Sequence, residues 1–121
     1  MNYALMFYQS PAEFAARTDP VKHKAFWGSF LPYMNSLHEA GIVVAGAGLE
    51  PPSMAKTMRT EKGKRLVQDG PYADSKEQLG GFFILNVPDL DTAMAWANRF
   101  PAACGGVTEV RPCLPPQANP A

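Results

Sequence analysis

The stretch LVQDGPYADSKEQLGGFFIL, residues 66–85, leads from one apolar segment through a turn and a charged loop into another apolar segment. Gly70-Pro71 is a turn signal, and Gly80-Gly81 ends the loop just before the apolar run at 82–85. We expect a strand on either side of this loop, and loops held at both ends by a sheet often carry function. The same residues would also make an ordinary solvated turn, and both interpretations stay open.

Several segments of the chain resemble the signature of the YCII-related family, also called the DGPF-domain family. The resemblance rests on Asp69-Gly70-Pro71-Tyr72, Lys76-Glu77, Leu79-Gly80-Gly81-Phe82, Leu49-Glu50-Pro51-Pro52, Pro88-Asp89-Leu90-Asp91 and Glu109-Val110-Arg111-Pro112. The family usually has Phe at the position of Tyr72. The resemblance implies an α+β, ferredoxin-like fold that forms dimers in the cytoplasm, and it implies no particular activity.

The totals are those of a single domain. The 121 residues include 11 basic and 11 acidic side chains, so the formal charge is zero. This balance argues against nucleic acid or an anionic membrane as the main partner. No apolar run approaches the roughly 18 residues that span a bilayer, and residues 1–10 do not look like a signal peptide. We therefore expect a soluble, cytoplasmic protein with one domain at 1–112 and a loose, proline-rich tail at 113–121.

Periodicity and turn signals predict the element order β-α-β, hairpin, β-α-β. The expected strands lie at 3–8, 42–49, 82–87 and 107–111, the hairpin at 55–60 and 65–68, and the helices at 19–40 and 88–100, with a short polar connection at 11–17. The apolar stripes of the two helices are Phe26, Phe30, Tyr33, Met34 and Leu37, and Leu90, Ala93, Met94 and Ala97, with Trp96 off the stripe. This order predicts a ferredoxin-like antiparallel sheet with two helices on one face and an inserted β-hairpin.

The strands at 3–8 and 82–87 are apolar on both faces. Two helices cover only one face of such a sheet, so something else must cover the second face. The economical partner is the same face of another copy, and two such faces would bury well over ~1,000 Å². We expect a homodimer of the dimeric α/β-barrel type. The alternative is a single layer with an exposed apolar face, which soluble monomers rarely have.

Charged side chains on the loop and on the last strand are candidates for acid–base chemistry. Asp69, at a strand end beside a cleft, is the expected main proton acceptor, with Glu77 and Glu109 as secondary acids. Glu109 and Arg111 are two residues apart and should project to the same face of their strand. Arg111 and Lys76 would hold an anionic substrate. The alternative is a surface or interface salt bridge without chemistry.

Histidine and tyrosine side chains complete the candidate set. His23 is a reserve general base, because a position in the first helical turn favours the neutral imidazole. A structural histidine is the other interpretation of His23, and we interpret His38 as structural. Tyr8 and Tyr72 belong to an aromatic set that could line a pocket, although core packing alone predicts aromatic residues of this kind.

The sequence contains no nucleotide or metal motif. The glycine-rich segment 45–48 lacks the spacing and the following helix of a dinucleotide site, and no His or Cys spacing suggests a metal. Cys104 and Cys113 form no Cys-x-x-Cys pair, and we expect two reduced thiols. We predict a homodimer without cofactors that binds a small organic molecule, with an anion as one option, and transfers a proton as isomerases and lyases do. The alternative is a non-catalytic module that senses a ligand or regulates a partner.

Overall fold

The computed structural model describes residues 1–116. Its main element is a four-stranded antiparallel sheet. The strand β1 (Asn2–Gln9) lies between β5 (Gln78–Asn86) and β6 (Val107–Pro112), and β2 (Val43–Gly48) pairs with the other edge of β5. The strand order β2-β5-β1-β6 is the one expected of a ferredoxin-like fold. The α+β class and the antiparallel sheet are therefore confirmed.

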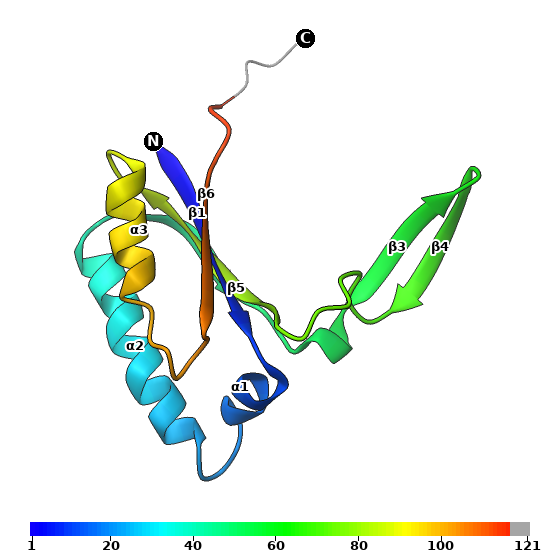
Figure 1. Ribbon diagram of the computed structural model, residues 1–121, viewed down its shortest axis with the longest axis horizontal. Helices are drawn as coiled ribbons and strands as arrows, with labels where there is room; N and C mark the ends of the chain where they lie inside the picture. The colour runs from blue at the N-terminus through cyan, green and yellow to red at the C-terminus, as the bar shows by residue number, and fades with distance from the viewer. Residues whose placement is uncertain (117–121) are drawn as a thin grey trace.

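Two long helices, α2 (His23–Glu39) and α3 (Leu90–Asn98), cover one face of this sheet (Figure 1). The stripe expected on α2 is confirmed, since its aromatic side chains and Leu37 are buried in the core. The stripe expected on α3 is partly wrong. Leu90 and Met94 are exposed, whereas Ala93 and Ala97 are buried and Trp96 packs against the core. The small alanine side chains let α3 lie close to β1 and β6, and Leu90 and Met94 face away from the sheet.

The segment between β1 and α2 is more regular than expected. Residues Pro11–Ala16 form a helix, α1, which opens with a capping box in which Ser10 and Glu13 each bond the other's backbone N–H. We expected the following helix to start at Asp19-Pro20, but α2 begins about one turn later, at His23. The Asp19 carboxylate accepts from the N–H groups of Val21 and Lys22 and closes a separate turn there.

The predicted hairpin is present as β3 (Lys56–Glu61) and β4 (Lys64–Asp69), which follow the short 3-10 helix η1 (Pro52–Met54). Gly63 has a φ of 77°, the left-handed conformation that a tight hairpin turn needs. The two strands form a sheet of their own, which we call the arm. The arm reaches away from the body on the side of the main sheet opposite α2 and α3 (Figure 1).

The second face of the main sheet has no helix over it, and we call it the open face (Figure 1). On β1 and β5 the helix-side residues are buried, whereas Ala4, Met6, Tyr8, Phe82 and Ile84 on the open face are only half-buried. The prediction that these strands are apolar on both faces is confirmed. The dimer that we derived from it stays a prediction.

Other expectations concern the ends and the thiols of the chain. In the part that is described, no helix is both long and apolar enough to cross a bilayer. The thiols of Cys104 and Cys113 are free, and the backbone N–H of Cys113 extends the β1–β6 pairing by donating to Asn2 O at 2.9 Å. Residues 113–116 have no regular secondary structure, and the rest of the expected tail, 117–121, lies outside the described residues.

Two buried acids make the fold sensitive to alkaline pH. Burial raises the pKa of the Cys104 thiol from 9.0 to about 11 and the pKa of the Tyr33 phenol from 10.0 to about 12. Between pH 9 and 11 for Cys104, and between pH 10 and 12 for Tyr33, the unfolded chain loses the proton and the folded chain keeps it, so stability falls as pH rises. We expect the urea midpoint to decrease as the pH rises above 9. The Cys104→Ala variant should decline less between pH 9 and 11, and an equal decline in both proteins would contradict the role of the thiol.

Candidate functional site

The open face carries a depression of about 450 Å³. It lies where β1 ends and β6 begins, beside the charged loop. We call it the open-face depression, and it is lined by Tyr8, Ser75, Glu77, Val107, Thr108 and Glu109. The hydroxyl of Tyr8 donates to Glu109 Oε1 at 2.8 Å. Arg111, on the same face as expected, donates from Nη2 to Glu109 Oε2 at 3.4 Å. The depression therefore contains a phenol and a carboxylate in direct contact, with a guanidinium beside them.

The electrostatics of the pair follow from this contact. The hydrogen bond to the Glu109 carboxylate is the main reason why the pKa of Tyr8 is raised, followed by burial and by the negative charge of Glu109. The positive charge of Arg111 opposes the shift. Tyr8 is therefore a neutral hydrogen-bond donor at physiological pH, and Glu109 is its acceptor.

The structure brings together only part of the predicted site. Tyr8, Glu77 and Glu109 line the same depression, and Arg111 reaches it through Glu109. Lys76 lines a neighbouring cavity. The sequence suggested this grouping only in part, because the contact between Tyr8 and Glu109 joins residues 101 positions apart.

The remaining predicted residues lie elsewhere. Asp69 sits on the arm, where its exposed carboxylate pairs with Lys56 Nζ at 2.6 Å, and it lines none of the cavities described here. The position expected for it, beside a cleft, differs from the observed one because the chain turns at Gly70 and β4 leaves the main sheet with the arm. Tyr72 is 71% exposed and its ring stacks under Arg59. Their assigned roles remain untested.

His23 also lies away from the depression. Its side chain is exposed, and Nδ1 is 2.9 Å from the backbone oxygen of Asp19. His23 is the first residue of α2, so its expected place in the first helical turn is confirmed, but its side chain lies on the outer surface of the helix. His38, which we expected to be structural, lines a different cavity between α2 and β2.

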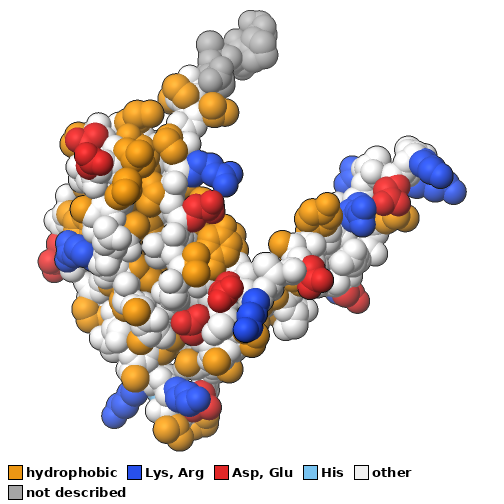
Figure 2. Space-filling model, in the orientation of Figure 1, with side chains coloured by type: hydrophobic (Ala, Val, Ile, Leu, Met, Phe, Trp, Pro, Cys, Tyr) orange, Lys and Arg blue, Asp and Glu red, His pale blue; other side chains and the backbone are white. Residues whose placement is uncertain are grey.

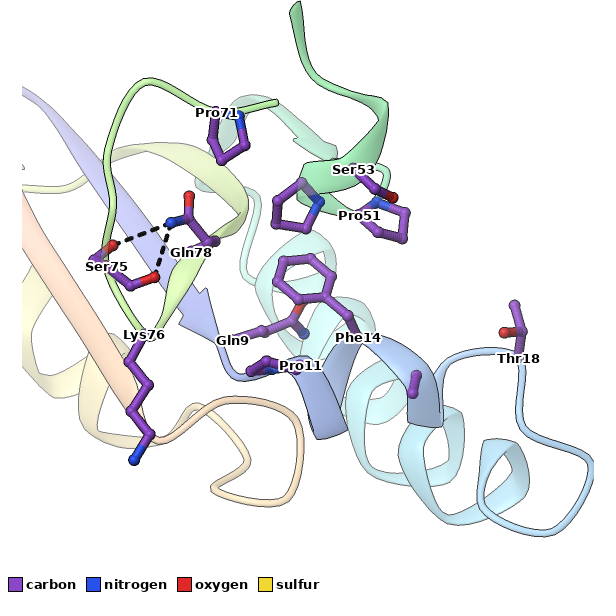
Figure 3. A pocket seen from close by; sticks show the side chains of 12 residues that line it. Gln9, Pro11, Phe14, Thr18, Pro51, Ser53, Pro71, Ser75, Lys76 and Gln78 are labelled. Atoms are coloured by element: carbon purple, nitrogen blue, oxygen red, sulfur yellow. Dashed lines mark hydrogen bonds between the residues drawn. The ribbon is translucent and has the colours of Figure 1, made fainter. Parts of the chain in front are cut away.

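A second cavity, of about 470 Å³, lies between α1, the proline corner before η1 and the charged loop (Figure 3). Its walls are Phe14 and several prolines, with Lys76 as the charged residue of its lining. Gln78 Nε2 donates to Ser75 O at 2.9 Å and to Ala73 O at 2.8 Å, and these bonds hold the loop in place. This cavity is apolar, and it presents no acid–base pair like that of Tyr8 and Glu109.

Sequence reasoning missed two interior polar residues. Gln9 is fully buried and donates from Nε2 to Cys104 O at 2.7 Å. The Gln9 side-chain oxygen accepts from Arg17, the residue that ends α1. A single arginine after a short helix belongs to no motif, so nothing in the sequence was a reason to select Arg17. For Gln9, the only indication of a buried amide was its position in the otherwise mostly apolar strand 2–9. Within residues 1–116, no three His, Cys, Asp or Glu side chains gather as metal ligands would.

Fold and site together define a two-layer, ferredoxin-like α+β protein with an open sheet face and a phenol–carboxylate pair upon it. The sequence model of the YCII-related domain matches residues 1–116, and the chain belongs to the YCII-related family. An uncharacterized protein of Rhizobium meliloti (strain 1021) is 41% identical over 76 residues, which are 61% of this chain and 61% of the relative. The match thus spans about three fifths of the curated relative's length.

A solved structure has a similar fold. It is 5-chloro-2-hydroxyhydroquinone dehydrochlorinase from Burkholderia phenoliruptrix AC1100, in complex with 2,5-dihydroxybenzoquinone. The TM-score is 0.53 at 17% identity, and the alignment covers 94% of each chain. At this identity the likeness supports the ferredoxin-like fold and does not extend to the chemistry.

Proposed function

We propose that the protein binds a small organic molecule in the open-face depression and transfers a proton there, without a metal or a nucleotide. The contact of Tyr8 with Glu109 at 2.8 Å carries the proposal, because it places a base and a neutral donor against the same space. The fold neighbour is complexed with a small cyclic organic molecule, which supports a ligand of this kind. In the proposal Glu109 takes the central role first expected of Asp69.

The proposed step begins with a substrate whose C–H bond lies next to a carbonyl group. The Glu109 carboxylate accepts the proton, the C–H electron pair moves into the new C=C bond, and the carbonyl oxygen becomes an enolate oxygen. Protonation of Glu109 weakens the acceptor that holds the Tyr8 hydroxyl, which then donates to the enolate oxygen. Where the enolate is conjugated with a further C=C bond, return of the proton to the far carbon of that system gives isomerisation, and departure of a leaving group with its electron pair from the adjacent carbon gives elimination.

Arg111 is the group beside the depression that would hold an anionic substrate. Arg111 already contacts Glu109 and has N–H groups left over for a carboxylate or phenolate. Glu77, which also lines the depression, is the secondary acid of the proposal. The free thiols of Cys104 and Cys113 support the cytoplasmic location that we infer, because thiols persist in reducing compartments.

We further propose that a second copy covers the open face and completes the depression. The centre of this face is apolar, and hydrophobic side chains are also visible at the surface of the arm (Figure 2). On the arm, Met58 is 59% exposed and Val67 is 69% exposed. A two-stranded hairpin is marginally stable in water by itself, so an arm with such residues needs a surface to pack on. The open face of a partner supplies that surface.

A deuterium-exchange experiment tests the proposed chemistry. Lactones, phenols and small keto acids are first screened for compounds that raise the melting temperature, and each stabilising compound is then followed by proton NMR in D₂O. We expect protein-dependent exchange at a carbon next to a carbonyl group. Glu109→Gln should slow the exchange about 10²-fold and Tyr8→Phe about tenfold.

Tyr72→Phe is the matched control, because the exposed Tyr72 ring stacks on Arg59 of the arm and does not line the depression, and this variant should exchange at the wild-type rate. Compounds that stabilise the protein and never exchange or react would contradict the enzyme and favour the non-catalytic binding module. The absence of any stabilising compound would contradict the binding proposal as well.

A further inference from the structure

Arg17 is a partly buried cation held by neutral groups. It ends α1, and its guanidinium donates from Nη1 to Leu49 O and from Nη2 to Gln9 Oε1 and to Gly80 O, the last at 2.9 Å. These three bonds leave two of the five N–H groups of a guanidinium unused. One of them, on Nε, is buried without any partner among residues 1–116.

The charge of Arg17 has no counter-ion in the described part of the chain. The three ion pairs there all lie elsewhere, on the arm and on β6. Burial lowers the pKa of Arg17, and the charge of the exposed Glu50 only opposes that effect. A guanidinium keeps its proton in proteins, so the positive charge persists in this apolar setting. A desolvated cation of this kind attracts an anion strongly.

A cavity of about 340 Å³, lined in part by Arg17, lies between α2, β2 and the core. We call it the Arg17 cavity, and it is lined mainly by Trp27, Phe30, Met34, Phe83 and the small residues of β2. Arg17 is its permanently charged residue, and His38 stands at the exposed end of α2. The volume falls within the roughly 300–1,000 Å³ of small-molecule pockets, whose walls are mostly apolar with a few placed polar groups.

The walls also indicate the shape of the ligand. Trp27 is anchored by its Nε1–H, which donates to Arg17 O at 2.9 Å, and its ring meets that of Phe30 edge to face at 5.6 Å. Flat aromatic walls of fixed orientation favour a flat ring between them. The cavity shares no lining residue with the open-face depression, so it is a separate site.

We propose that the Arg17 cavity binds a small aromatic carboxylate, with the carboxylate toward the Arg17 guanidinium and the ring against Trp27 and Phe30. A carboxylate supplies the missing negative charge, and the ring displaces water from the apolar walls. The site is independent of the chemistry proposed for Tyr8 and Glu109.

Titration of the full-length protein with benzoate tests this assignment, with benzamide as the uncharged compound of the same shape. Calorimetry and tryptophan fluorescence follow binding, since Trp27 lines the cavity. We expect benzoate to saturate the site and to bind at least about tenfold more tightly than benzamide. Arg17→Gln should remove this preference. Arg99→Gln, at an arginine stacked on Trp96 on α3 and outside the cavity, should keep it.

A second variant keeps the test decisive if Arg17→Gln fails to fold. A Cβ at Gly48 would meet no atom within 4 Å, so Gly48→Leu narrows the cavity and leaves Arg17 in place. It should weaken benzoate binding at least about tenfold. The proposal is overturned if benzoate does not saturate below about 10 mM, or if benzamide binds equally well. It is also overturned if binding survives in Gly48→Leu and is lost in Tyr8→Phe, which would place benzoate in the open-face depression.

Discussion

Replacing Ile84 by glutamate is expected to convert the proposed dimer into monomers of about 13.1 kDa at micromolar concentration. Ile84 lies on the open face in the middle of the sheet, paired with Ala4 of β1 on one side and Ala45 of β2 on the other. In a two-fold dimer the new carboxylate would be buried twice, once in each copy. With a desolvation cost of roughly 3 kcal/mol per copy, the dissociation constant should rise about 10⁴-fold.

Sedimentation velocity of the wild type and the variant measures this effect, and circular dichroism shows whether the variant is folded. Val21→Glu is the matched control, because Val21 is 84% exposed in the turn before α2 and the substitution adds the same charge. The control should sediment as the wild type does. A wild type that sediments as a monomer would contradict the dimer, and a dimeric Ile84→Glu protein would move the interface away from the open face.

Gly81→Ala is expected to lower the free energy of unfolding by about 3 kcal/mol. A Cβ at this position would lie 2.4 Å from Phe7 Cζ and 2.7 Å from the backbone oxygen of Ala47. Neither neighbour moves easily, because Phe7 is packed between other rings, including Phe100 at 4.8 Å, and Ala47 belongs to β2. The loss is a large part of a typical stability of 5–15 kcal/mol and should lower the melting temperature by roughly 10 °C.

Gly106→Ala provides the comparison for this variant. A Cβ at Gly106 would meet nothing within 4 Å, and its backbone is not in the left-handed region. Its stability should therefore stay within about 1 kcal/mol of the wild type. Urea unfolding of both variants measures the difference, and similar midpoints would show that the close approach at Gly81 does not restrict the fold.

Much of the fold could be predicted because it depends on local patterns. The double apolar character of strand 82–87 identified a sheet that is buried on one face and apolar on the other. The stripe on α2 follows from its helical period, and the hairpin follows from glycine between two short strands. The stripe predicted for α3 was partly wrong, because the helical period does not distinguish alanine from larger apolar residues. The helix buries the side with Ala93 and Ala97, where small side chains allow closer packing.

The candidate site could be predicted only where its members share a strand. Glu109 and Arg111 are two residues apart on β6, so alternation alone places them on the same face. Asp69 was misplaced because the sequence shows where a strand ends and does not show that this strand leaves the main sheet.

The sequence by itself determined the succession of the strands and of the two helices α2 and α3 along the chain, the apolar character of both sheet faces and the membership in the YCII-related family. Periodicity and turn chemistry are local properties, so they can be read along the chain. Only the tertiary structure decided that Tyr8 meets Glu109, that the arm carries Asp69 away, and that Arg17 lines a cavity and has no counter-ion among residues 1–116. Such contacts depend on which strands are neighbours in the sheet and on their register, because these bring residues that are distant in the sequence together.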